Sequence, residues 1–198
     1  MTDWKREEER LENARFVGRT AEQEQFRSLL RQPASRPRLL NVYGIGGIGK
    51  SRLLRMYETL ARLEGTAFVM ADFRDIAPLP EAFEAHLRHI LSSGDDHPGD
   101  ALQQLAAQRQ VVLALDSYER AASIDGWLRD SFIPRLHAGI LIVIAGRYAL
   151  DGGWFRSAYW SRQMAKLHLE GFSEAEVGQF VSVYLGEEDE AFAAKVYA

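Results

Sequence analysis

A glycine-rich turn between an apolar run and an amphipathic segment constrains this chain more than any other feature. The turn reads Gly44-Ile45-Gly46-Gly47-Ile48-Gly49-Lys50-Ser51, which matches the pattern G-x-x-x-x-G-K-[ST] at every fixed position. The run before it, residues 39–43, is short and mostly apolar, which is typical of a buried parallel strand. After the turn, apolar residues recur at helical spacing, at Leu53, Leu54, Tyr57, Leu60 and Ala61. Strand, turn and helix follow in the order that a phosphate-binding loop requires.

The residue types in this turn suit a phosphate group. Glycine adopts positive φ freely and lets the backbone approach phosphate oxygens, so that successive N–H groups and the following helix start form an anion-binding concavity. In such a loop Lys50 supplies positive charge to the β- and γ-phosphates, and the hydroxyl of Ser51 binds Mg²⁺. We therefore expect residues 44–51, together with Arg52 directly after them, to contact a nucleotide. The alternative is a glycine-rich turn that ends in Lys-Ser by chance, and the flanking strand and helix argue against it.

Composition limits the class of protein and its compartment. The 198 residues are 46% hydrophobic and 26% charged, which is ordinary for a globular protein and excludes a disordered or fibrous one. The net charge of -4 gives no direct nucleic-acid signal and argues against broad binding to an anionic membrane. The absence of cysteine excludes disulfides and thiolate metal sites, and no signal peptide or run of about 18 apolar residues is present. We expect a soluble, cytoplasmic protein.

Five short apolar runs alternate with helical patterns along the chain. The runs are residues 39–43, 66–71, 111–116, 140–146 and 164–169. Strands separated by helices imply right-handed crossovers and a parallel sheet covered on both faces. The sequence therefore predicts an α/β fold, with a five-stranded parallel-sheet P-loop NTPase core and helices on both faces. We expect the aromatic-rich stretch 148–161 to be a loop.

Polar residues follow the third run, on the side of the sheet where ligands of parallel strands bind. Asp116 ends that run and is expected to hold Mg²⁺, although a capping aspartate fits the same position. Glu119 either polarises the attacking water or is a solvated glutamate near a helix start. Ser117 occupies the position after Asp116 where many ATPases carry the catalytic acid, so we expect slow hydrolysis.

Arg147 follows the fourth run. An unpaired guanidinium is costly at a buried edge, and this one can reach a γ-phosphate or form a structural salt bridge with a carboxylate. We favour the phosphate contact. The candidate catalytic residues are then Lys50, Asp116, Glu119 and Arg147.

These pieces together resemble the STAND class of signal-transduction ATPases, which includes the NB-ARC and NACHT modules. The resemblance covers about residues 16–198 and rests on the order and spacing of five segments. They are Phe16-Val17-Gly18-Arg19 followed by Glu22 or Glu24, the phosphate-binding loop, Leu113 to Glu119, Ala145-Gly146-Arg147, and Leu167 to Glu176.

The resemblance implies a role for each matching residue. Lys50 and Ser51 would contact phosphate and metal, and the adenine and ribose would lie against Val17, Gly18 and Arg19.

For the remaining site residues, the resemblance makes Asp116 the Walker B metal residue and Arg147 the sensor of the terminal phosphate. The strand order of the family would place the Arg147 strand between the strands that end at Gly44 and Asp116.

The chain is expected to have three regions. The highly charged residues 1–15 are expected to form a helix or arm. The resemblance makes residues 16–170 the nucleotide-binding domain and 171–198 the beginning of a small helical lid. Ser173 and Glu176 have the form of a capping box where the lid helix would start. The Gly-x-Pro motif of the family's lid, its winged helix and its repeats are missing. We therefore expect part of a larger protein, whose protein partners or self-oligomerisation depend on regions outside this chain.

Two hypotheses for function follow. The first is an ATP/ADP-binding switch with slow Mg²⁺-dependent hydrolysis, acting in signal transduction or transcriptional regulation. The alternative is a housekeeping P-loop enzyme, such as a nucleotide-dependent kinase or a DNA-associated ATPase. A kinase would need an acceptor site and an arginine-rich lid, and a DNA motor would need a basic face. The segment Val17-Gly18-Arg19 favours the switch.

Overall fold

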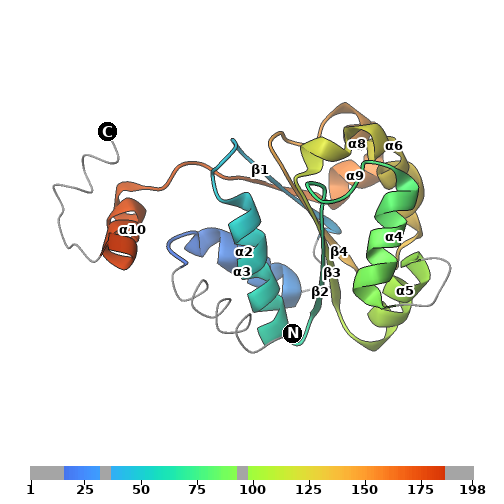
Figure 1. Cartoon of the computed structure of the whole chain (residues 1–198), viewed down its shortest axis with the longest axis horizontal. Coiled ribbons are helices and arrows are strands. Elements are labelled where there is room, and N and C mark those ends of the chain that lie inside the picture. The colour runs from blue at the N-terminus through green and yellow to red at the C-terminus, as the bar shows by residue number, and fades with distance from the viewer. Residues whose placement is uncertain (1–15, 32–36, 93–97, 186–198) are drawn as a thin grey trace. The chain divides into compact units, whose positions relative to one another are not determined.

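The computed structural model of the chain describes residues 16–31, 37–92 and 98–185 (Figure 1). The chain divides into two compact units. The larger unit is residues 25–169, and the smaller one combines residues 1–24 with residues 170–198.

The larger unit is built on one sheet of five parallel strands. The strands are β1 (Leu39–Tyr43), β2 (Ala67–Asp72), β3 (Val111–Asp116), β4 (Leu141–Gly146) and β5 (Met164–His168). Their order across the sheet is β2-β3-β4-β1-β5. The predicted fold class is confirmed, and β4, which leads to Arg147, lies between β1 and β3 as the resemblance implied.

Helices cover both faces of the sheet (Figure 1). On one face, the strand residues Leu113, Ile142 and Ile144 join a core with Phe83 of α4 (Pro80–Leu91) and Leu102 of α5 (Pro98–Gln108). Alternate residues of each strand point to the other face, where α3 (Lys50–Leu63) lies. Helix α2 (Thr20–Arg31) packs on α3 through residues of the larger unit, since the ring of Phe26 stacks on that of Tyr57 at 4.0 Å. All residues of β3 and β4 are buried, which explains why both sequences are apolar apart from Asp116 at the end of β3.

Short helical segments follow strands β3 and β4. After β3 come a 3₁₀ segment η1 (Tyr118–Ile124), α6 (Asp125–Trp127), a π segment η2 (Leu128–Phe132) and α7 (Ile133–Arg135). After β4 come α8 (Gly152–Phe155) and α9 (Ala158–Gln163). The prediction of a loop over residues 148–161 was therefore wrong. The physical reason is burial, because Trp154 and Trp160 are both in the core and their rings meet edge to face at 5.3 Å.

The smaller unit contains α10 (Glu174–Leu185), which begins with the predicted capping box. The N–H of Ser173 donates to Glu176 Oε2 at 2.8 Å, and the N–H of Glu176 donates to Ser173 Oγ at 3.4 Å. The predicted N-terminal arm, residues 1–15, and the end of the predicted lid, residues 186–198, lie outside the described residues. In the part of the chain that the structure describes, no helix is long and apolar enough to cross a membrane.

Candidate nucleotide-binding site

The loop between β1 and α3 needs its glycines for two different reasons. Gly47 and Gly49 have φ angles of 82° and 100°, and a Cβ on either would meet no atom within 4 Å. Backbone conformation, not crowding, therefore requires glycine at these two positions. At Gly44 the reason is space, since a Cβ there would lie 2.6 Å from the carbonyl oxygen of Leu169. The loop thus presents bare backbone immediately before the start of α3, the arrangement that binds anions.

Lys50 is the first residue of α3, and its side chain folds back over the loop. Its Nζ donates to the carbonyl oxygen of Gly44 at 2.7 Å and to that of Ile45 at 2.8 Å. Burial lowers the pKa of Lys50, while the carboxylates of Glu119 and Asp116 act in the opposite direction. The ammonium therefore already lies among the loop atoms that would surround a phosphate. Arg52, the other cation predicted here, has an exposed side chain on the first turn of α3.

Ser51 and Asp116 are brought together across the sheet. The Ser51 side chain hydrogen-bonds the carboxylate of Asp116, which is only 2% exposed at the end of β3. The N–H of Ser117 donates to Asp116 Oδ1 at 2.7 Å. Burial raises the pKa of the Asp116 carboxyl, and these two hydrogen bonds partly oppose the shift. A hydroxyl beside a carboxylate is a hard oxygen donor set, which fits Mg²⁺ better than a soft metal.

A second ionic pair adjoins Asp116 and was missed by the sequence reasoning. Arg74, just beyond β2, places its Nε 2.8 Å from Asp72 Oδ2, and its Nη2 lies 3.9 Å from Asp116 Oδ2. Asp72 also receives a hydrogen bond from the side chain of Ser117. Burial acts to raise the pKa of Asp72, but the hydrogen bonds from Arg74 and Ser117 and the charge of Arg74 together lower it. The signal that could have found the pair is register, because Asp72 and Asp116 are direct partners in neighbouring parallel strands.

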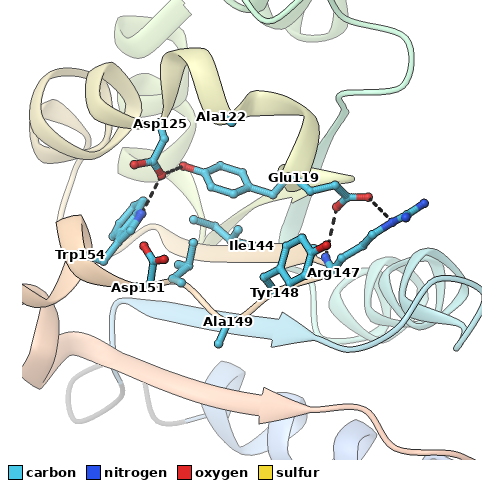
Figure 2. Close-up of a pocket in the computed structure, with 12 residues that line it drawn as sticks. Glu119, Ala122, Asp125, Ile144, Arg147, Tyr148, Ala149, Asp151 and Trp154 are labelled. Carbon is cyan, nitrogen blue, oxygen red and sulfur yellow. Dashed lines mark hydrogen bonds and ion pairs between the residues drawn. The ribbon is translucent and has the colours of Figure 1, made fainter.

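Glu119 and Arg147 meet each other beside the phosphate-binding loop (Figure 2). The Arg147 Nε lies 3.2 Å from Glu119 Oε1, and the Arg147 N–H donates to Glu119 Oε2 at 3.2 Å. The Arg147 side chain is 59% exposed, and its guanidinium carbon is 3.7 Å from where a Cβ on Gly46 would be. The salt bridge with a carboxylate, the alternative considered for Arg147, is thus formed here. Its contact with a terminal phosphate stays a prediction.

A cavity of about 390 Å³ extends from this ion pair between η1 and the segment after β4 (Figure 2). Its far wall is fixed by Asp125, whose Oδ1 accepts from the Tyr118 hydroxyl and from Trp154 Nε1, each at 2.8 Å. The Arg129 guanidinium donates to the other oxygen of Asp125 at 2.8 Å. One carboxylate therefore ties η1 to α8 along this wall of the cavity.

Val17, Gly18 and Arg19 belong to the smaller unit, where they form an irregular turn before α2. Gly18 and Arg19 have φ angles of 67° and 57°. The Arg19 N–H donates to Glu176 Oε1 at 2.9 Å, and its guanidinium donates to the Glu170 carbonyl at 2.7 Å. Val17 and Gly18 line a cavity of about 580 Å³ within this unit. Their predicted contacts with adenine and ribose stay a prediction.

A family model described as an AAA ATPase domain matches residues 15–144 of the chain. No curated protein sequence matches it significantly.

Many solved structures resemble the chain at low sequence identity. One is from the E. coli MS115-1 HORMA:CdnC:Trip13 complex, with 16% identity, a TM-score of 0.60, and coverage of 100% of this chain and 78% of that one. The Aeropyrum pernix ORC2 protein shares 16% identity at a TM-score of 0.52, covering 82% of this chain and 50% of its own. The structure of Drosophila ORC bound to DNA shares 14% identity at a TM-score of 0.58, covering 80% and 44%.

At these identities the structural likeness speaks for the fold alone, and the chain spans half or less of the two ORC chains. The family model covers most of the chain, including the phosphate-binding loop and Asp116. The chain therefore belongs to the AAA ATPase domain family, a family of nucleotide-binding P-loop ATPases.

Proposed function

We propose that this chain is an ATP/ADP-operated switch of the STAND type, with slow Mg²⁺-dependent hydrolysis, acting in signal transduction as part of a larger protein. The observation that carries the proposal is the position of Arg147. Its guanidinium packs against Gly46 of the phosphate-binding loop and pairs with Glu119. A terminal phosphate at the loop would offer this exposed guanidinium a second anionic partner.

Nucleotide binding rests on the loop and on Lys50. The backbone N–H groups of the loop would donate to phosphate oxygens, and the Lys50 ammonium would exchange the carbonyl oxygens of Gly44 and Ile45 for phosphate oxygens. Ser51 and Asp116 supply two adjacent oxygen ligands for Mg²⁺. When bound, Mg²⁺ neutralises charge on the phosphates and helps to orient them.

Slow hydrolysis is expected from the two residues near Asp116 that could act on water, Ser117 and Glu119. Ser117, at the position where many ATPases carry an acid, hydrogen-bonds Asp72 and has no carboxylate to polarise water. Glu119 is the carboxylate that could do so, but it is held by both the backbone and the side chain of Arg147. We therefore expect this chain to bind nucleotide and to hydrolyse ATP slowly.

A nucleotide switch has two protein conformations, and ATP and ADP must differ in their preference between them. A nucleotide that binds both conformations with equal affinity does not change their populations. Only ATP brings a γ-phosphate to Arg147. Breaking the Glu119 pair and forming a phosphate pair gives the protein two discrete arrangements of the residues that follow β4.

Isothermal titration calorimetry with ADP and with a non-hydrolysable ATP analogue, both with Mg²⁺, tests this proposal. Arg147→Ala is expected to weaken the analogue by roughly 1–3 kcal/mol, the range of a charge-assisted hydrogen bond, and to change ADP affinity far less. Arg135→Ala removes an exposed arginine at the end of α7 and serves as the matched control. Equal losses for both nucleotides, or none, would contradict the switch.

A second candidate is a DNA-associated ATPase, and one surface segment favours it. Residues 152–169 contain Arg156, Arg162 and Lys166 but no Asp or Glu, although the chain as a whole is acidic. Phe155 and Tyr159 are 39% and 48% exposed there, and Lys166 Nζ lies 4.3 Å from the centre of the Phe155 ring. Cations interleaved with exposed rings suit phosphates and bases.

Fluorescence anisotropy with a labelled single strand and a labelled duplex decides between the two candidates. A DNA-associated ATPase should bind with a strong dependence on salt, and Arg162→Ala with Lys166→Ala should weaken that binding. No binding at low salt would leave the nucleotide switch as the function of this chain.

A further inference from the structure

A single polar side chain lies within β1, the strand that leads into the phosphate-binding loop. Asn41 is fully buried, between Leu40 and Val42 in the sequence and beside Ile144 of β4 in the sheet. Burying an amide costs free energy unless its oxygen and nitrogen find hydrogen-bond partners. A leucine of similar size would fill the same space at no such cost, so the packing of the sheet does not itself require asparagine.

The Asn41 amide finds its partners on β4 and beyond it. Its Oδ1 accepts from the N–H of Leu150 at 2.9 Å, and its Nδ2 donates to the carbonyl oxygen of Ile144 at 3.3 Å. Leu150 is buried and lies three residues after Arg147. A backbone N–H can only donate, so the amide oxygen must face Leu150 and the amide orientation is fixed.

The segment from Arg147 to Leu150 is consequently held at both of its ends. At one end the Arg147 N–H donates to Glu119, and at the other the Leu150 N–H donates to Asn41. Asn41 lies on β1, three residues before Gly44, which begins the phosphate-binding loop, so the loop that carries Arg147 is attached to the strand that leads into the phosphate-binding loop.

We propose that Asn41 is a positioning residue that sets the guanidinium of Arg147 against the phosphate-binding loop, and thereby the preference for ATP over ADP. This inference rests on the proposed function, because it needs Arg147 to recognise the terminal phosphate. Loss of the Asn41 oxygen leaves a buried N–H at Leu150 without an acceptor, and the segment must move toward water to satisfy it. Arg147 moves with the segment, and a misplaced guanidinium loses the geometry of its phosphate contact.

The test compares Asn41→Leu, Asn41→Asp and Val42→Ala by calorimetry with ADP and with the non-hydrolysable ATP analogue. Asn41→Leu is expected to reduce the affinity ratio of analogue to ADP by about tenfold, while ADP affinity stays within about threefold of the wild type. Asn41→Asp keeps an oxygen for the Leu150 N–H and, when protonated at this buried position, an O–H for the Ile144 carbonyl, so it should restore most of the ratio. Val42→Ala lowers the thermal stability of the same buried strand without touching this segment, and should leave the ratio unchanged.

Amide hydrogen exchange of the wild-type protein gives a second test that needs no folded variant. Coupling between two events is reciprocal. If the hydrogen bond from the Leu150 N–H to Asn41 raises the affinity ratio of analogue to ADP tenfold, then the fraction of molecules in which this bond is open must be about tenfold smaller with the analogue bound than with ADP bound. The Leu150 amide should therefore exchange more slowly with the analogue bound.

The outcomes separate this inference from the function on which it rests. If Arg147→Ala changes the affinity ratio and Asn41→Leu does not, the positioning role of Asn41 is wrong and the switch stands. Equal exchange of the Leu150 amide with the two nucleotides would overturn it in the same way. If neither variant changes the ratio, the switch itself is wrong.

Discussion

Glu119 holds Arg147 by two contacts of equal length, one from the backbone N–H and one from the guanidinium Nε, each 3.2 Å from a different carboxylate oxygen. The pair is partly exposed to solvent, so the ionic part of it is worth about 1 kcal/mol or less. A phosphate carrying more than one negative charge can compete with such a weak partner. The contact is therefore strong enough to order the arginine and weak enough to be exchanged.

Glu119→Gln should strengthen binding of a non-hydrolysable ATP analogue by up to about fivefold, because the exposed ion pair that competes for Arg147 is worth about 1 kcal/mol or less. ADP affinity should stay close to that of the wild type. Calorimetry with both nucleotides measures the effect, with Glu84→Gln on α4 as the control for loss of a carboxylate. A weaker analogue complex would mean that Glu119 supports the bound state.

Lys50→Ala should weaken ATP and ADP alike by roughly 2–5 kcal/mol, since both carry phosphates that lose a desolvated cation. Calorimetry for each nucleotide measures the loss, and a thermal melt without nucleotide shows whether the variant is folded. Unchanged affinity would remove the loop from the nucleotide site. Loss of ATP binding alone would place Lys50 on the terminal phosphate only.

Asp116→Asn should stabilise the nucleotide-free, metal-free protein at neutral pH. The pKa of this buried carboxyl is raised in the folded state, so the unfolded chain releases its proton first as the pH increases. The free energy of unfolding of the wild type therefore decreases as the pH rises from the pKa of Asp116 in the unfolded chain to its pKa in the folded protein. The asparagine variant does not show this decrease. Melting curves at pH 4 and pH 7.5 should show that the melting temperature of the variant, relative to that of the wild type, is higher at pH 7.5 than at pH 4.

The same variant should lose the Mg²⁺ dependence of ATP binding while it retains part of its affinity, because Lys50 and the loop remain. Titrations with Mg²⁺ and with EDTA test this half of the prediction. Normal Mg²⁺-dependent hydrolysis by Asp116→Asn would exclude Asp116 as a metal ligand.

Gly18→Ala should lower the stability of the smaller unit by roughly 1–3 kcal/mol. The φ angle of 67° disfavours a side chain, and a Cβ would clash with Glu176 Oε1, an oxygen already held by the Arg19 N–H. Gly178→Ala is the matched control on α10, where a Cβ meets nothing within 4 Å and alanine should favour the helix. Limited proteolysis and thermal melts compare the two. Equal stability of both variants would show that the turn at Gly18 tolerates a side chain.

The fold could be predicted because each strand is encoded by its own apolar run, and the loop at residues 44–51 by its own residue types. Asp116 was found in the same way, as the polar end of a buried strand. The contacts of Arg74 and Asn41 were missed, because finding them requires the register of neighbouring strands, which the apolar runs alone do not give. Helices α8 and α9 escaped prediction since Gly152 and Gly153 disfavour a helix, and only burial of Trp154 and Trp160 orders the segment.

The strand order has a consequence for the growing chain on the ribosome. A chain that has emerged only as far as Asp116 already contains the loop at residues 44–51, but not β4, the strand that joins β1 to β3. Ser51 and Asp116 cannot meet until Leu141–Gly146 has been synthesised and inserted between strands made earlier. ATP in the cell therefore cannot stabilise the half-made chain through the complete site, and the open edges of β1 and β3 must be kept from other partners during that interval.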